Sequence, residues 1–261
     1  YCLSKCTYTI MGDVAQNISD RYGLNDWTEL RKLMLPGEFD YFGILQKSYR
    51  NTVEISGFAT DILYHGSFPV YPVEPIIRHG ESVTVKTCVD FTDQVTQAEQ
   101  TIKQWQCKGL LRLCHLDTIA VVCIDEAEAE KVTAALQGSV ELNTGDAGKW
   151  EIGEGVMVLP LKYTKGLEFD AVLIFNASEE DYPVEDGYVK QLYVAATRAL
   201  HELTVLYRGK LTGLIADPVS PEQKKRMRLA ADAQKKPVKT VVKQAEPEKT
   251  KEEIYRQRAQ E

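Results

Sequence analysis

Residues 160–170 constrain the fold of this chain more than any other stretch. A Lys-Gly pair, Lys165 and Gly166, leads into the run Leu-Glu-Phe-Asp, and segments rich in Val, Ile and Leu lie on both sides. This pattern predicts a buried strand, a tight glycine turn and a second buried strand. Such an arrangement places the turn and the carboxylate of Glu168 at a strand end, where open α/β sheets bind their ligands.

Strand-like and helix-like segments alternate along most of the chain. Short runs of β-branched and apolar residues are separated by longer segments whose apolar residues recur at helical spacing. The alternation predicts an α/β fold with a parallel sheet flanked by helices. We expect strands at 8–11, 38–45, 83–88, 118–123, 156–160, 171–175 and 203–207, and helices at 25–35, 52–64, 93–108 and 126–136.

Residues 191–200 predict one further helix. Its apolar residues recur at intervals of three and four from Leu192 to Ala199, so they occupy one face of the helix. Arg198 projects from another face. From there we expect this arginine to reach into a cleft.

Four short motifs resemble those of the UvrD/Rep/PcrA-type superfamily 1 helicases. The run TKGLEFD at 164–170 is similar to the fifth helicase motif, and LYVAATRA at 192–199 is similar to the sixth. The run IMGDVAQNI at 10–18 is similar to the third motif, and LQKSYRNT at 45–52 to the fourth. The motifs follow the family's order, so the resemblance implies a RecA-like α/β fold, the second motor domain of such a helicase.

The nucleotide-holding parts of phosphate-loop enzymes are missing from this sequence. It has neither a Gly-rich Gly-Lys-Ser/Thr loop nor a paired acidic strand for magnesium. The family carries both in its first RecA-like domain. The resemblance therefore implies that residues 1–24 end that first domain, that residues 25–217 form the second, and that the missing N-terminal RecA-like domain of the same protein is its partner. The chain then holds half of a site for ATP with Mg²⁺, and the metal ligands lie in the missing domain.

The resemblance assigns two arginines and a glutamine to catalysis. By analogy with the family, Arg50 and Arg198 approach the γ-phosphate of ATP from across the cleft between the two domains. A guanidinium suits this role because it meets two phosphate oxygens at once and stays charged at cellular pH. Gln16 is expected to sense the same phosphate and to report it to the nucleic-acid track.

The resemblance assigns binding of the adenine and the ribose to the fourth and fifth motifs. The resemblance implies that Tyr49 stacks on the adenine. Glu168, beside the Gly166 turn, is expected to accept a hydrogen bond from the ribose.

Two positions depart from the unwinding members of the family. Those members usually carry a Thr and, two residues later, a His that touch single-stranded DNA, where this chain has Pro160 and Lys162. Proline offers a phosphate neither a hydroxyl nor an N–H, so Lys162 remains as the candidate nucleic-acid contact. There is also no room between Tyr64 and Thr118 for the large helical subdomain that unwinding members insert. Both departures resemble the HelD branch, whose members bind RNA polymerase.

Three functional readings follow from these motifs. The first is an ATP-coupled factor that acts on RNA polymerase, and the second is an ATP-dependent helicase or translocase on single-stranded DNA. The third is an interaction domain without catalysis, which describes this chain taken alone. Residues 1–217 carry a net charge of −12, and residues 218–261 carry +5. The acidic body repels nucleic-acid phosphates over most of its surface, which favours the polymerase reading modestly.

Composition also bears on disorder, on membrane contact and on the state of the cysteines. Residues 218–261 are charged, rich in proline and poor in large apolar side chains, which predicts disorder with short helices at 221–233 and 249–260. No apolar run approaches the roughly 20 residues that span a bilayer, so we expect a cytoplasmic protein without membrane contact. The six cysteines form no CxxC pair and the four histidines are scattered, which indicates reduced, mostly buried thiols and no metal site.

Overall fold

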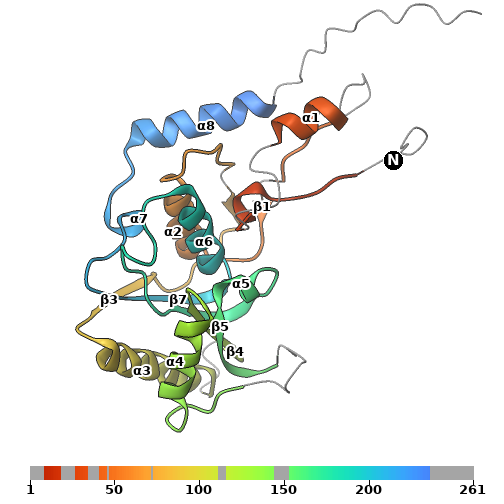
Figure 1. Cartoon of the computed structure of the whole chain (residues 1–261). Coiled ribbons are helices and arrows are strands. Elements are labelled where there is room, and N and C mark those ends of the chain that lie inside the picture. Colours follow the sequence, from red (N-terminus) through yellow and green to blue (C-terminus); the bar gives the residue numbers. More distant parts are fainter. Residues whose placement is uncertain are drawn as a thin grey trace, which may run out of the picture.

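Five parallel strands form the central sheet of the structure, which is a computed structural model (Figure 1). The residues that it describes are 9–18, 27–34, 41–45, 47–71, 73–110, 116–143 and 153–235. The strand order is β3-β7-β6-β4-β5, and every neighbouring pair is parallel. The strands are β3 (Thr84–Cys88), β4 (Thr118–Cys123), β5 (Gly155–Pro160), β6 (Phe169–Ile174) and β7 (Ala199–Arg208).

Helices cover both faces of this sheet (Figure 1). On one face lie α3 (Phe91–Leu110) and α4 (Glu126–Leu136), and on the other lie α2 (Val53–Leu63) and α6 (Asp186–Ala196). The shorter described elements and the last helix are η1 (Val14–Gln16), α1 (Thr28–Met34), β1 (Lys47–Ser48), β2 (Glu74–Pro75), α5 (Leu161–Thr164), α7 (Gly213–Ala216) and α8 (Pro221–Lys235).

The inner strands are apolar without interruption because both of their faces are covered. In β4 every residue from Ile119 to Cys123 is buried. Ala120 and Val122 belong to the core under α2 and α6, and Ile119 and Val121 to the core under α3 and α4. Parallel strands between two helical layers show this continuous pattern rather than an alternation of apolar and polar residues.

The α/β fold expected from the sequence is confirmed. The strands predicted at 83–88, 118–123, 156–160, 171–175 and 203–207 correspond to β3, β4, β5, β6 and β7, and the helices predicted at 25–35, 52–64, 93–108 and 126–136 correspond to α1, α2, α3 and α4. Between Tyr64 and Thr118 the described residues form only β2, β3 and α3 as regular elements.

Two strand predictions near the start of the chain are wrong. Residues 9–13 and 41–45 have no strand structure; Tyr8 and residues 38–40 lie outside the described residues. Apolar and aromatic residues suggested strands at both places, but a strand also needs a neighbour that takes its backbone hydrogen bonds. The neighbouring segment β1 does have one, because it pairs in parallel with β2 in a separate two-stranded sheet.

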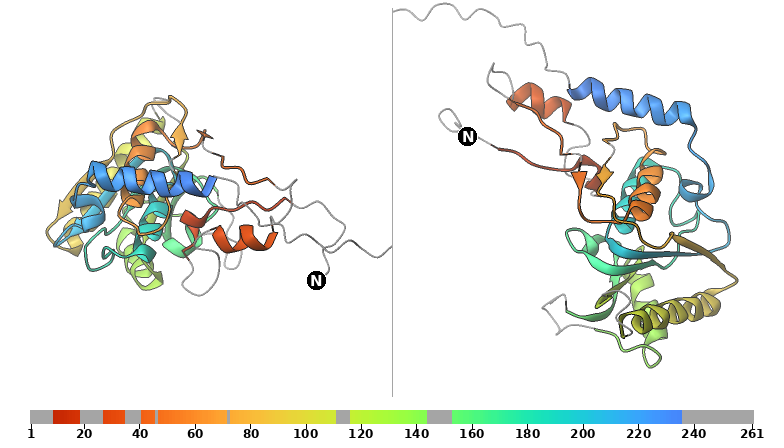
Figure 2. Two further views of the ribbon diagram at one scale, coloured as in Figure 1. Left: turned by 90° about the horizontal axis from the view of Figure 1, so that it is seen from above. Right: turned by 180° about the vertical axis from the view of Figure 1, so that it is seen from behind.

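The helix α8 confirms the short helix predicted at 221–233 and shows that the prediction of disorder is wrong for residues 221–235. Met227 of α8 is buried in the core on the α2 side of the sheet. Gln223 Nε2 donates to the carbonyl of Tyr64 at 2.8 Å, and Arg228 Nε donates to the Tyr64 hydroxyl at 2.9 Å. Figure 2 shows α8 lying over the face opposite to α3. Composition predicted disorder because it ignored this one apolar side chain and its docking site; residues 236–261, including the helix predicted at 249–260, lie outside the described residues.

Two further expectations concern membrane-spanning helices and the cysteines. No helix among the described residues is long and apolar enough to cross a bilayer. Cys88 and Cys123 are buried free thiols and Cys107 is an exposed one, whereas the other three cysteines lie outside the described residues.

Candidate functional site

Three of the four motifs meet where β6 and β7 begin, at the edge of the sheet that is formed by the amino ends of its strands. Phe169 of β6 pairs with Ala199 of β7. Glu168 immediately precedes the first strand and Arg198 immediately precedes the second, so the register brings these residues to neighbouring positions. Arg50 joins them from the segment before α2, and its Nε lies 2.6 Å from Glu168 Oε1.

The fifth motif reaches this edge through the glycine turn. Gly166 has φ +86°, a left-handed conformation that L-residues with a side chain rarely adopt. The turn follows α5, and the N–H of Leu167 donates to the carbonyl of Thr164 at 3.0 Å. No atom lies within 4 Å of the place where a Cβ would sit, so the backbone conformation alone selects glycine.

Arg198 lies in the turn between α6 and β7. The helix predicted at 191–200 ends at Ala196, so Arg198 is not on a helix face and does not project outward; only 1% of it is exposed. Its Nε donates to Val194 O at 3.0 Å, its Nη1 to Leu167 O at 3.0 Å and its Nη2 to Thr197 Oγ1 at 3.2 Å. These three bonds hold the guanidinium in the interior, at the end of α6. The helical spacing did not predict this burial.

The charge of Arg198 has no carboxylate in contact among the described residues. Its three acceptors are neutral oxygens, which engage three of the five N–H groups of the guanidinium. Burial, and then the neighbouring charge of Arg50, lower the pKa of Arg198. A buried positive charge without a carboxylate in contact favours an anionic ligand.

The ion pair of Arg50 and Glu168 is the exposed part of the site. The two side chains are 37% and 42% exposed. The single carboxylate of Glu168 faces the charges of both arginines, and it opposes the downward shift of the Arg198 pKa. Glu168 therefore pairs directly with Arg50, whereas Arg198 has no carboxylate in contact among the described residues.

The third motif packs against α6, next to this edge. Val14 of η1 is buried, and Ala15 and Ile18 contact the core that α6 covers. Asp13 caps η1 by accepting the N–H of Ala15 at 2.9 Å, and it also accepts Gln16 Nε2 at 2.7 Å. Gln16 is half-buried, and its side chain is bonded to Asp13 of the same motif.

The sequence missed three residues near the arginines. Tyr193 of α6 is buried, which raises its pKa, and Asp13 acts in the same direction. Asp13 opposes the downward shift of the Arg198 pKa as well, which places it near that guanidinium. Asn51 is buried beside Arg50 and binds main-chain oxygens of the sixth motif. All three stand within motifs that the sequence already singled out, and that position is the signal that could have found them.

The two remaining predicted residues are Tyr49, which immediately precedes Arg50, and Lys162, which lies elsewhere. Tyr49 is 71% exposed, so its ring is open to a ligand. Lys162 follows the end of β5, at the opposite edge of the sheet, where it pairs with Glu126 and its Nζ lies 4.8 Å from the ring centre of Tyr163. Pro160 is buried at the last position of β5. The structure therefore does not bring Lys162 together with Arg50, Glu168 and Arg198.

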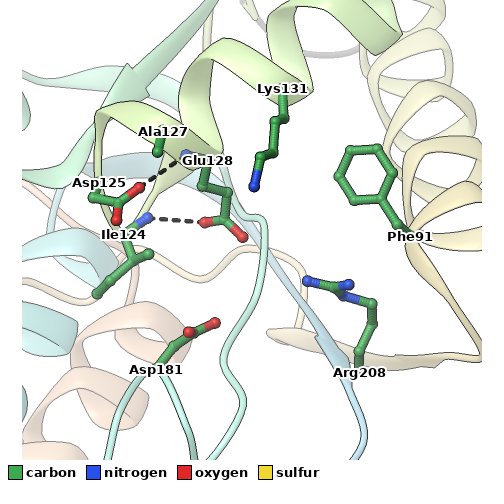
Figure 3. Close-up of a pocket in the computed structure, with 8 residues that line it drawn as sticks. All are labelled: Phe91, Ile124, Asp125, Ala127, Glu128, Lys131, Asp181 and Arg208. Carbon is green, nitrogen blue, oxygen red and sulfur yellow. Dashed lines mark hydrogen bonds between the residues drawn. The ribbon is translucent and has the colours of Figure 1, made fainter.

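A separate hollow of about 400 Å³ lies where β3, β4 and β7 end (Figure 3). Its lining consists of Phe91, Ile124, Asp125, Ala127, Glu128, Lys131, Asp181 and Arg208, and none of the predicted site residues is among them. Burial raises the pKa of Glu128, whose Oε2 accepts the N–H of Ile124 at 3.0 Å. Three carboxylates against two cations disfavour a phosphate ligand in this hollow. The described residues contain no group of three His, Cys, Asp or Glu that could hold a metal ion.

The glycine turn was expected to place Glu168 at the strand end where α/β sheets bind ligands. Ligands of open α/β sheets bind at the carboxyl ends of the strands, where this hollow lies. Glu168 lies instead at the amino end of β6, so the expected strand end was the wrong one. The arginines, rather than the general rule for α/β sheets, mark the candidate site.

Comparison with known proteins places the chain in a family. The sequence profile of the UvrD-like helicase C-terminal domain matches residues 156–206, which include Gly166, Glu168 and Arg198 but not Gln16, Tyr49 or Arg50. No curated protein matches the chain.

A solved structure gives the longer match. It is described as the C-terminal domain of a possible DNA helicase from Lactobacillus plantarum WCFS1. Its sequence is 30% identical, the match covers 67% of this chain and 96% of that one, and the TM-score is 0.51. The chain belongs to the family of UvrD-like helicase C-terminal domains.

Proposed function

We propose that this domain completes the ATP site of a UvrD-like motor protein by supplying two arginines to the γ-phosphate. The observation that carries the proposal is the charge of Arg198, which is buried, has only neutral oxygens as hydrogen-bond partners among the described residues, and lies near Arg50. A triphosphate is an anion that two neighbouring guanidinium groups can bind, because each fork meets two phosphate oxygens. The phosphate loop and the ligands of Mg²⁺ belong, on this proposal, to another domain of the same protein.

The chemistry expected of the site is phosphoryl transfer to water. In such reactions the protein mainly positions charge around the transferred group. Arg50 and Arg198 would stabilise the negative charge on the γ-phosphate, and Gln16 would sense that phosphate. Tyr49, whose ring is exposed, would stack on the adenine, and Glu168 would accept a hydrogen bond from the ribose.

The chain alone is expected not to hydrolyse ATP, because its sequence contains no phosphate loop. A purified sample should show no phosphate release above a blank. Turnover that disappears in an Arg198→Ala variant of the chain would contradict the division of the site between two domains. Turnover by the chain that survives this change would contradict both the division of the site and the role of Arg198.

Two observations bear on what the motor acts on. The description of the Lactobacillus relative as a possible DNA helicase supports a translocase or helicase on single-stranded DNA. The pairing of Lys162 with Glu126, the burial of Pro160 and the acidic body support the second candidate, a HelD-like factor that captures RNA polymerase. An acidic surface suits channels that otherwise hold nucleic acid.

The whole protein separates these candidates in one set of measurements. A DNA motor should bind single strands with an affinity that falls steeply with salt, and it should unwind a tailed duplex when ATP is present. If Lys162 touches a phosphate, Lys162→Ala should lower the salt slope by about one. Lys103→Ala is the matched control, because Lys103 also pairs with a surface carboxylate, Glu99.

The HelD-like candidate predicts the opposite pattern. DNA binding should be weak, the Lys162→Ala variant should match the control, and the protein should retain RNA polymerase in a pull-down. ATP-dependent unwinding without retention of the polymerase would exclude this candidate.

A further inference from the structure

Asn51 connects the segments that carry the two arginines. It follows Arg50 in the sequence and immediately precedes Thr52, whose Oγ1 caps α2 by accepting the N–H of Ile55. Only 6% of Asn51 is exposed. Its Nδ2 donates to the carbonyl of Thr197 at 3.1 Å and to the carbonyl of Ala199 at 2.5 Å. These two carbonyls belong to the residues on either side of Arg198.

The geometry fixes the orientation of the Asn51 amide. Two carbonyl oxygens converge on one atom of the side chain, and only the NH₂ group can donate to both. The reverse orientation would place three oxygens together. An aspartate of the same shape would have no donor to offer at this place.

Arg78 adds a second connection between the same segments. Its Nη2 donates to the carbonyl of Arg50 and, at 3.2 Å, to the carbonyl of Leu200. The carbonyl of Arg78 in turn accepts the N–H of Val53, the first residue of α2, at 3.0 Å. The main chain around Arg50 is thereby held to the start of β7 from two directions.

We infer that Asn51 is a positioning residue that sets the place of Arg198 relative to Arg50. The inference rests on the proposed function, because it concerns how the two arginines reach one phosphate together. Both side chains must meet oxygens of the same small group, and a displacement of about 1 Å at such a site costs on the order of a hundredfold in rate. The Asn51 amide fixes the main chain at Arg198 without touching the ligand itself.

The test uses the whole protein with Asn51→Ala. The kcat for ATP hydrolysis should fall by about tenfold to a hundredfold, while the KM for ATP stays within about threefold, because nucleotide binding does not depend on the arginines alone. Gln94→Ala is the matched control: Gln94 is also a buried amide that donates to a main-chain carbonyl, that of Phe175, and it lies on the other face of the sheet. Both variants should lose similar thermal stability, but only Asn51→Ala should lose turnover.

A second variant and a double variant complete the test. If Asn51→Ala does not fold, Asn51→Ser retains one donor and should show a smaller loss of kcat. In the Arg198→Ala background, adding Asn51→Ala should change kcat by less than about twofold, because a residue that acts through Arg198 has nothing left to position. Losses that multiply, or an equal loss in Gln94→Ala, would overturn the inference. If Arg198→Ala itself keeps its turnover, the proposed function fails and not only the role of Asn51.

Discussion

Arg50 and Glu168 form an ion pair that joins the fourth motif to the fifth, with 2.6 Å between Nε and Oε1. The pair uses the Nε of Arg50, so the two Nη groups are the part of this guanidinium left to meet a phosphate. In the proposed site Glu168 would therefore have two roles, because it would orient Arg50 and would also accept a hydrogen bond from the ribose.

The pair should matter more for nucleotide binding than for stability. Both partners are more than a third exposed, so Glu168→Gln should lower the free energy of unfolding by less than about 1 kcal/mol. In the whole protein the same change should weaken ATP binding about tenfold, which corresponds to about 1.4 kcal/mol. Titration with a fluorescent ATP analogue measures this. Glu179→Gln is the control, since Glu179 pairs with Lys210 at 2.6 Å away from the site; an equal loss of affinity in both variants would contradict the role of Glu168.

The acid stability of the domain should depend on Glu54. The hydrogen bond from His79, and then that from the N–H of Gly80, lower the pKa of Glu54 from 4.5 to about 2. Because this pKa is lower in the folded state, the contribution of Glu54 to stability is complete above pH 4.5. It is lost as the pH falls through about 2.

Urea unfolding at several pH values checks this expectation. Glu54→Gln should lower the midpoint most above pH 4.5, and its difference from the wild type should shrink toward pH 2. Glu130→Gln, on the exposed surface of α4, should show no such pH dependence. A constant difference at every pH would show that Glu54 acts through packing rather than through its charge.

The helix α8 should stabilise the domain through Met227. Met227→Ala should lower the free energy of unfolding by about 2 kcal/mol, because it removes a buried side chain and leaves a cavity. Leu229→Ala, on the exposed side of the same helix, should change it by less than about 0.5 kcal/mol. Chemical unfolding measures both. Limited proteolysis should also leave residues 221–235 attached to the domain, and early cleavage between Pro218 and Met227 would contradict the docking of α8.

The sheet could be predicted because its signals are local. Strands buried on both faces are continuous apolar runs, and β4 and α4 were predicted with the bounds that the structure shows. Segments 9–11 and 41–45 were predicted wrongly, since a strand depends on a neighbour that no local pattern reveals. The docking of α8 depends in the same way on a partner, Tyr64, far away in the sequence.

The site was predictable only as far as its motifs reach. The motifs identified Arg50, Glu168 and Arg198, and the structure brings all three to one edge of the sheet. The burial of Arg198 was not predicted, because its acceptors include Leu167 of another motif. Asn51 escaped notice for a related reason, since its partners are main-chain oxygens of distant residues that leave no mark in the side-chain pattern.

Arg198 is proposed to act on the γ-phosphate, and the substitution Arg198→Lys in the whole protein is the decisive measurement of this role. Lysine keeps the charge but loses the fork, so ATP turnover should fall by about 10³-fold to 10⁵-fold while nucleotide affinity falls by less than about tenfold. Arg208→Lys, at the other end of β7, is the control and should keep its turnover within about twofold. A parallel loss of binding and turnover in Arg198→Lys, or turnover equal to that of the Arg208→Lys control, would contradict the claim.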